Sequence, residues 1–348
     1  MLVCSILCSP DHQTPGHLCA LTQPLSCLFT TMTRQIVVER PLLEIGCTLG
    51  PVYDPKTSVL HFVDIDEGKV RRIPLTAWSQ ARVAKIIHYN TVNLGVEVEE
   101  FDEKIGCIAL RRNGPGLAGA AAQGFALFPG NSQKDYISRP LPVEHQPYTR
   151  FNDGGCDSKG RFFAGTMYDK ARNIPGELWR FDPSDGSCTV VDPGPFTDSN
   201  GMGWTADEKT FYFTDSIENI IYAYDYHDGE LSNRRVFVDA MAVGLARNSF
   251  ADGLCVDMDG YVWSARWGGS RVVRFSPDGQ IDLEVVIPSV LNVTSCAFGG
   301  PENDLLYITT AHCKASGEET MQREFMDSGH LFVVQTEVKG VARYPFGL

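Results

Sequence analysis

Hydrophobic residues along this chain come mostly in short runs of about four to eight, separated by polar turn residues. The runs are rich in Val, Ile, Phe and Tyr, whose branched or aromatic side chains favour extended strands. Turn dipeptides such as Asn-Gly, Asp-Gly and Asp-Pro recur between the runs, and few windows show the spacing of an amphipathic helix. The pattern predicts an all-β chain of short strands joined by tight turns.

The strand pattern repeats along the chain at a nearly constant interval. The strongest strand of each unit begins at Leu60, Gly116, Phe162, Phe211, Tyr261 and Leu306. Successive starts lie 56, 46, 49, 50 and 45 residues apart. This spacing is typical of a propeller blade of four strands, whose repeats run to roughly 40–50 residues. The sequence therefore predicts a six-bladed β-propeller that occupies residues 35–348 as a single domain.

A polar residue followed by glycine precedes the strongest strand in three consecutive units. The three steps are Asp153-Gly154, Asn200-Gly201 and Asp252-Gly253. Each step on its own is also explained as an ordinary β-turn, since such dipeptides are common there. Their recurrence in step with the repeat indicates that each one opens the first strand of a blade, which lines the central channel. Glycine permits close approach of neighbouring backbones, and we expect the polar side chains to converge at one channel mouth.

Asn200 and Asp252 are the candidate metal ligands. An amide oxygen and a carboxylate are hard donors that suit Ca²⁺, Mg²⁺ or Mn²⁺, and a carboxylate also suits Zn²⁺. So few charged ligands leave room for water and substrate, and we therefore expect one divalent cation with a catalytic role. The eight histidines show no metal-binding spacing, and no Gly-x-Ser-x-Gly elbow of a serine hydrolase occurs.

Arg150 and Asn152 lie just before the same step in the third unit and are the candidate substrate-binding residues. A guanidinium at this place can bind a carboxylate or polarise an oxygen atom. The alternative for Arg150 is an ion pair with Asp153 or Asp157.

Composition limits the partners and the compartment. The formal net charge of −13 disfavours binding to a polyanion, so nucleic acid is not an expected partner. No run of about 18 apolar residues occurs, and no membrane association is expected. The 11 cysteines contain no Cys-x-x-Cys pair and no disulfide framework, which is typical of reduced thiols and predicts a cytoplasmic protein.

Residues 1–31 hold one formal charge, Asp11. They are expected to be disordered and irrelevant to the chemistry, and Met32 is a more natural start of the chain.

Several segments together resemble the regucalcin (senescence marker protein) and gluconolactonase family. In chain order they are FVDI at 62–65, RFNDG at 150–154, FFAGTM at 162–167, SNG at 199–201, FTDS at 213–216, SNRR at 232–235, DGLCVD at 252–257 and TSCAFGG at 294–300. The resemblance extends over about residues 42–345. It implies a six-bladed propeller that hydrolyses sugar lactones with one divalent cation near the channel mouth.

The resemblance also implies roles for particular residues. In such proteins a Glu, an Asn and an Asp bind the metal, and the Asn corresponds to Asn200. The Asp corresponds to Asp252 and is also thought to be the base that activates water. The family's arginine and asparagine that contact the sugar lactone correspond to Arg150 and Asn152.

One metal ligand of the family is missing from this chain. The family Glu lies two residues before a proline, and Leu49 takes that place in the stretch CTLGPVY at 47–53. The sequence reads as if a Glu-Gly pair had been deleted after Gly50. The internal repeat indicates the same gap, and nearby Glu44 would substitute only if the chain bent differently. A second departure is Lys170, which stands where the family has an acid that touches substrate.

We therefore predict a metal-dependent hydrolase that acts on a small sugar lactone. Asp252 is the expected base, Asn200 and Asp252 bind the cation, and Arg150 and Asn152 bind the substrate. Two alternatives stay open. The missing Glu favours a catalytically impaired, calcium-binding protein of the regucalcin type. The other alternative is an arylesterase or organophosphate hydrolase on the same fold, which would differ mainly in the loop 131–149.

Overall fold

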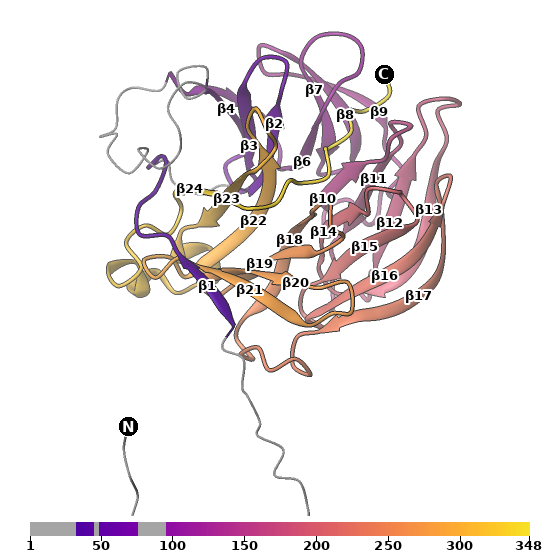
Figure 1. Ribbon diagram of the computed structural model, residues 1–348. Coiled ribbons are helices and arrows are strands. Elements are labelled where there is room, and N and C mark those ends of the chain that lie inside the picture. The colour runs from indigo at the N-terminus through magenta and orange to yellow at the C-terminus, as the bar shows by residue number, and fades with distance from the viewer. Residues whose placement is uncertain (1–32, 45–48, 76–94) are drawn as a thin grey trace, which may run out of the picture. The chain divides into compact units, whose positions relative to one another are not determined.

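The computed structural model describes residues 33–44, 49–75 and 95–348, and the predicted disorder of residues 1–31 lies outside them. Residues Thr33–Leu348 form one compact unit. Its strands belong to six sheets, in which successive strands of the chain are antiparallel neighbours (Figure 1). The predicted all-β, six-bladed propeller is thus confirmed. No helix among the described residues is long and apolar enough to cross a membrane.

The first three blades follow one another along the chain, and the strands of each run from the channel outward. Blade one consists of β2 (Leu49–Asp54), β3 (Val59–Asp64), β4 (Lys69–Pro74) and β5 (Glu97–Glu100). Blade two consists of β6 (Ile105–Leu110), β7 (Leu117–Ala121), β8 (Gly124–Gly130) and β9 (Gln133–Ser138). Blade three consists of β10 (Phe151–Cys156), β11 (Phe162–Thr166), β12 (Gly176–Phe181) and β13 (Cys188–Phe196).

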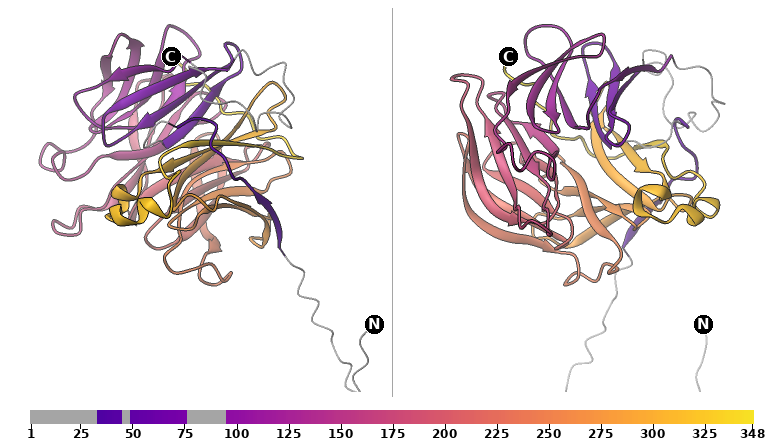
Figure 2. Two further views of the ribbon diagram at one scale, coloured as in Figure 1. Left: turned by 90° about the vertical axis from the view of Figure 1, so that its left-hand side faces the viewer. Right: turned by 180° about the vertical axis from the view of Figure 1, so that it is seen from behind.

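The other three blades repeat this plan with one addition and one shorter sheet. Blade four consists of β14 (Ser199–Trp204), β15 (Thr210–Asp215), β16 (Ile220–His227) and β17 (Glu230–Asp239). Blade five consists of β18 (Phe250–Val256), β19 (Val262–Trp267), β20 (Arg271–Phe275) and β21 (Ile281–Val286), with β1 (Arg34–Val37) added outside. Blade six consists of β22 (Asn292–Gly299), β23 (Leu305–Ala311) and β24 (Leu331–Gln335). Two short 3-10 helices, η3 (Cys313–Ser316) and η4 (Glu319–Arg323), lie side by side between β23 and β24 (Figure 2).

The innermost strands form a closed ring around a central channel. Each of them packs against the innermost strand of the next blade, and β22 packs against β2. The glycines of the polar-Gly steps lie at these contacts, as the sequence predicts. A Cβ atom added to Gly201 would lie 2.1 Å from the backbone nitrogen of Leu254 in the next blade. Only glycine therefore permits the neighbouring inner strands to approach so closely.

The N-terminal segment joins the fifth and sixth blades. β1 pairs in parallel with β21, from Arg34 opposite Leu283 to Val37 opposite Val286. A few residues later Leu43 forms an antiparallel bridge with Leu331 of β24. The first described residues (indigo in Figure 1) thus pair with blades five and six, which come last in the sequence. These pairings hold the ring closed.

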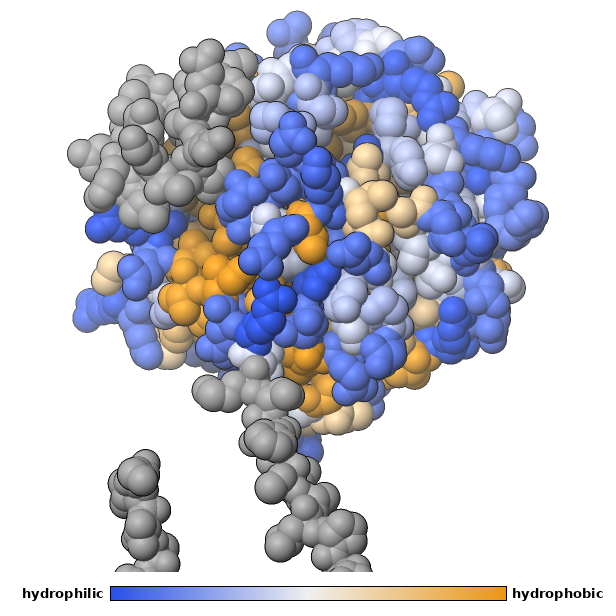
Figure 3. All heavy atoms as spheres, in the orientation of Figure 1, coloured by the Kyte–Doolittle hydropathy of each residue, from blue (hydrophilic) through white to orange (hydrophobic). Residues whose placement is uncertain are grey.

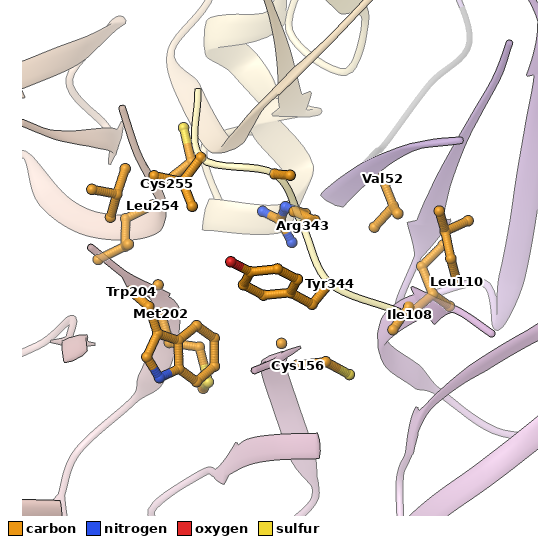
Figure 4. A pocket seen from close by; sticks show the side chains of 16 residues that line it. Val52, Ile108, Leu110, Cys156, Met202, Trp204, Leu254, Cys255, Arg343 and Tyr344 are labelled. Atoms are coloured by element: carbon orange, nitrogen blue, oxygen red, sulfur yellow. The ribbon is translucent and has the colours of Figure 1, made fainter. Parts of the chain in front are cut away.

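The C-terminal segment 341–348 crosses one end of the channel. Its backbone is hydrogen-bonded to three blades, from Val341 N to Val256 O, Phe346 N to Leu110 O and Gly347 N to Gly160 O. Arg343 and Tyr344 lie between the ends of the inner strands and leave a cavity of only about 50 Å³ there (Figure 4). This end of the channel is therefore filled by the chain itself.

Apolar side chains fill the interfaces between blades, while hydrophilic residues cover much of the outer face seen in Figure 3. Between blades three and four the core is aromatic. Phe163 is fully buried and its ring lies 5.4 Å from Trp204 and 5.8 Å from Phe211, measured between centroids. The rings pack at tilted or edge-to-face angles, which aromatic pairs prefer.

Truncation of this aromatic core is expected to be costly. Phe163→Ala should lower the free energy of unfolding by about 3–5 kcal/mol, because it removes a buried ring and leaves a cavity. Val236→Ala is the matched control, since Val236 is 56% exposed and should change stability by about 0.5 kcal/mol or less. Chemical denaturation of both variants measures the difference. Equal stabilities would contradict a tightly packed interface between the two blades.

Candidate functional site

The inner strands share a β-bulge that places one residue of each at the channel mouth. In β10, two residues between Phe151 and Gly154 face a single residue of β11. The same break occurs in β14 between Ser199 and Met202, and in β18 between Ala251 and Leu254. A bulge re-aims the side chains it carries and is frequent beside active sites. The first residues of these three bulges are Asn152, Asn200 and Asp252.

This register corrects one detail of the sequence interpretation. The repeat pairs Asp153 with Asn200 and Asp252, because each of them precedes a glycine. In the structure Asn152 is the equivalent residue and Asp153 is the second of its bulge. Asp153 does not line the pocket at this mouth, and burial raises the pKa of its carboxyl group, with Arg343 of the C-terminal segment acting in the opposite direction. A bulge shifts the register by one residue, which a dipeptide pattern does not reveal.

All four candidate site residues line a single pocket of about 600 Å³ at the open end of the channel. Its polar wall comes from blades three, four and five and contains Arg150, Asn152, Asp198, Asn200, Ser216 and Asp252. Its apolar wall contains Leu49, Ile65, Met167, Ile217, Phe250 and Trp267. Residues distant in the chain therefore meet at one place, as the repeat predicts.

A chain of hydrogen bonds fixes the polar side chains of the pocket. Arg150 Nη1 donates to Asn152 Oδ1 over 2.6 Å and to the Phe151 carbonyl over 3.0 Å. Asn152 Nδ2 donates in turn to Asn200 Oδ1 over 3.0 Å, and Asn200 Nδ2 donates to Ser216 Oγ over 2.8 Å. The amide oxygen of Asn200 keeps a second lone pair for a further partner. The four side chains are thus held in place before any ligand arrives.

The alternative ion pair of Arg150 is not formed by the described residues. Asp157 is bonded instead to Arg161, which belongs to the same blade. Burial lowers the pKa of the Arg150 guanidinium, whereas Asp198 and Asp66 act in the opposite direction. Arg150 therefore contributes a positive charge to the pocket.

Asp252 is buried, and its carboxyl pKa lies well above the ordinary value. Burial is the main cause, and the nearby carboxylates of Asp198 and Asp153 add to it. Arg266 acts in the opposite direction but is itself fully buried, and its Nη2 donates to Asn219 Oδ1 over 2.8 Å. The negative charge of Asp252 is thus poorly compensated by the protein.

Asp198 is a pocket residue that the sequence reasoning missed. It lies two residues before Asn200, and side chains two apart along a strand point to the same face. That parity is the signal that would have revealed it, since Arg150 and Asn152 have the same spacing. Its Oδ1 atom is buried without a hydrogen-bond partner among the described residues. Burial raises the pKa of its carboxyl group to about 6, with Arg150 opposing and Asp215 adding to the rise.

Blade one contributes no ligand atom at the register of Asn200 and Asp252; among its described residues the carboxylate in the pocket is that of Asp66, which is exposed and paired with Lys104. Leu49 lies on the pocket wall, and Gly50 is the register equivalent of Asn152, Asn200 and Asp252. A Cβ atom at Gly50 would meet no other atom within 4 Å, so the space for a side chain is open. Glu44 and Lys170 are exposed and do not line the pocket, and residues 45–48 lie outside the description.

The chain matches proteins of known type over most of its length. Residues 47–312 match the family model described as SMP-30/Gluconolactonase/LRE-like region. Over 307 residues the chain is 32% identical to a regucalcin of Danio rerio, covering 85% of this chain and 93% of the relative. Over 275 residues it is 34% identical to the pentonolactonase XacC of Haloferax volcanii, covering 78% and 84% of the two chains.

A solved structure has the same fold. It is a protein of Agrobacterium tumefaciens described as a calcium-binding protein, regucalcin. The TM-score is 0.77 at 22% identity, and the superposition covers 91% of this chain and all of the other. At this identity the likeness supports the propeller fold alone.

Proposed function

The chain belongs to the SMP-30/gluconolactonase/LRE-like family, and on this premise we propose that it is a metal-dependent lactonase that opens sugar lactones or similar cyclic esters. The observation that supports this most is the convergence of Arg150, Asn152, Asn200 and Asp252 on one pocket. One relative is a pentonolactonase, so the chemistry occurs within the family. The presence of a divalent cation is part of this proposal and is suggested by family membership.

The donor atoms of the pocket fit a divalent cation that prefers oxygen. Asn200 offers an amide oxygen and Asp252 a carboxylate, and both are hard donors. The raised pKa of the buried Asp252 carboxyl points the same way, because a bound cation would supply the missing positive charge. When bound, such a cation supplies Lewis-acid polarisation of the lactone carbonyl.

The residues of the chain have distinct parts in the proposed reaction. Asp252 takes a proton from water while the water oxygen bonds to the carbonyl carbon. The bond between that carbon and the ring oxygen then breaks, and the ring oxygen gains a proton to become a hydroxyl group. Arg150 and Asn152 hold the hydroxyl groups of the substrate in the orientation that this attack requires.

A substrate and cation panel tests the proposed function. Purified protein is stripped of metal and assayed on sugar lactones with Ca²⁺, Zn²⁺, Mn²⁺ or Mg²⁺ added singly. We expect turnover that disappears with a chelator and returns with at least one of these ions. Aryl esters and organophosphates are assayed beside the lactones. Faster turnover of either would identify the chain as an arylesterase or organophosphate hydrolase instead.

A cation-binding protein without turnover is the second candidate function. Leu49 replaces the family's metal-binding Glu, and the described residues contain no group of three or more His, Cys, Asp or Glu side chains that could hold a metal. Cation binding without metal-dependent turnover of any substrate in the panel would favour this candidate.

Loss of the pocket arginine is expected to weaken substrate binding. Arg150→Ala removes the donor to Asn152 and a charge that faces substrate, and it should raise KM by about 10-fold or more, since bonds to charged groups contribute about 1.5–3 kcal/mol. The matched control is Arg172→Ala, because Arg172 pairs with Asp169 and does not line the pocket. Steady-state kinetics of both variants give the comparison. Equal KM values would remove Arg150 from substrate binding.

A further inference from the structure

The carboxyl group of Asp198 lines the pocket, and one of its oxygen atoms forms no hydrogen bond with the described residues. Its backbone is fixed on both sides, because its N–H donates to Asp215 Oδ1 over 3.2 Å and its carbonyl accepts from Ser216 N over 3.0 Å. The residue also bridges to Met167 of the neighbouring blade. Its Oδ1 atom is nevertheless buried and has no hydrogen-bond partner among the described residues. A buried carboxylate oxygen left in this way is costly unless a ligand satisfies it.

Asp198 and Asp252 also act on each other through their charges. Both carboxyl groups line the same pocket, and the Oδ1 atom of Asp198 is buried there. Asp215 faces Asp198 from the same blade with a further negative charge, and Arg150 is the cation that acts on Asp198 from blade three. No ion pair joins Asp198 to Arg150 among the described residues, and Arg150 is committed to Asn152 and the Phe151 carbonyl. Asp198 and Asp252 thus share one side of the pocket with too little positive charge.

The three oxygen-bearing side chains lie in the same part of the pocket. Asp198 and Asn200 come from adjacent same-side positions of blade four, and Asp252 comes from the bulge of blade five. The inner strands of these two blades pack directly against each other. On the opposite wall Leu49 offers only hydrocarbon, and the carboxylate of Asp66 is exposed and already paired with Lys104 over 2.8 Å. Any cation that enters is therefore drawn to the side of the pocket formed by blades four and five.

We propose that Asp198 supplies the second carboxylate to a divalent cation held between Asp198, Asn200 and Asp252. This inference rests on the proposed function and assigns the residue that takes over from the ligand absent in blade one. Two carboxylates balance the charge of the ion, and the ligand set consists only of oxygen atoms. Such a set suits Ca²⁺, Mg²⁺ or Mn²⁺ better than a softer metal.

Titration of the full-length protein with a cation tests the role of Asp198. Metal-free wild-type protein and the variant Asp198→Asn are titrated with Ca²⁺ and with Mn²⁺ in a calorimeter. We expect the substitution to weaken binding at least about 10-fold, because even residues that only support a ligand affect affinity by 10–100-fold. Thermal unfolding with and without the ion provides a second readout, and the stabilisation by the ion should shrink in the variant.

Asp66→Asn is the matched control. Asp66 lines the same pocket and its replacement removes the same charge, but it is exposed and accepts a hydrogen bond from Lys104 over 2.8 Å. We expect its effect on affinity to stay below about 3-fold, since exposed charges are screened by solvent. Asp198→Ser serves as a second variant, and the circular dichroism of all variants shows whether they fold.

The outcomes separate this inference from the proposed function. Equal affinities of wild type and both Asp198 variants, or equal losses in Asp198→Asn and Asp66→Asn, would overturn the role of Asp198 and leave the lactonase proposal standing. A loss confined to the Asp198 variants, in a protein that opens no lactone, would support the role of Asp198 and overturn the lactonase proposal. Absence of any cation binding by the wild type would overturn the role of Asp198.

Discussion

Asp252→Ala is expected to reduce lactone turnover by a factor of at least about 10²–10⁴, the usual contribution of a positioned acid or base. The same substitution removes one of the proposed cation ligands, so the true loss should lie at the upper end of this range or beyond it. Initial rates with saturating cation measure the effect. Retained activity would remove Asp252 from the mechanism.

The stability of the related variant Asp252→Asn should not fall with the activity. The pKa of Asp252 is raised in the folded protein, so its ionised form is disfavoured by folding at neutral pH. Stability from this group is therefore present at low pH and is lost as the pH rises through its ordinary pKa and on to the raised one. Asp252→Asn should have a melting temperature in metal-free buffer at pH 7 that equals or exceeds that of the wild type. Asp225→Asn is the control, because Asp225 is exposed, pairs with Arg235 and does not line the pocket, so its loss should leave both turnover and melting temperature nearly unchanged.

Insertion of Glu-Gly after Gly50 is expected to raise cation affinity by about 10-fold or more and to increase turnover at limiting cation. The insertion restores the spacing that the family resemblance implies and adds a carboxylate to the wall where Leu49 now lies. The insertion begins where the described residues leave space, since a Cβ atom at Gly50 would meet no described atom within 4 Å, and Gly50 itself keeps its φ of +52°, which suits glycine. A residue that binds the cation directly should matter at least as much as the residues that support such a ligand, whose loss costs about 10–100-fold in affinity.

A Gln-Gly insertion at the same place is the control for the altered loop. It lengthens the chain equally but brings no charge, so its effect on affinity should be much smaller. Calorimetric titration of both insertions with Ca²⁺ and Mn²⁺ gives the comparison. Equal affinity of the Glu-Gly insertion and the wild type would mean that the wall at Leu49 is not part of the cation site.

Much of the fold is predictable from the sequence because each blade carries the same apolar signal. The six runs beginning at Leu60, Gly116, Phe162, Phe211, Tyr261 and Leu306 all fall at or within one residue of the second strand of a blade. Such strands are buried on both faces by neighbouring blades, so their apolar runs are continuous and easily recognised. The parallel addition of β1 and the crossing of the channel by residues 341–348 depend on contacts between distant segments. The hydrophobic pattern within a single strand does not indicate such contacts.

The candidate site is predictable in part for a similar reason. Asn200 and Asp252 repeat at the spacing of the blades, and the structure brings them to one pocket. Asn152 is obscured by Asp153, because the bulge and not the dipeptide decides which residue faces the channel. Asp198 has the same two-residue spacing from Asn200 that Arg150 has from Asn152, but its counterparts at Arg150 and Phe250 have different chemistry, so the repeat indicates its position and not its role. Its importance arises from burial and from a missing hydrogen-bond partner, both of which require coordinates.

Arg343 and Tyr344 fill one end of the central channel, so that among the described residues the candidate pocket opens at the other end. A lactone and the acyclic acid made from it would then exchange through the same opening, one after the other. The acid carries a negative charge that the ester lacks, and Arg150 stands beside its path. A product retained by that arginine would block the next substrate molecule. The side chain proposed to orient the incoming ring would then also set the rate of product release.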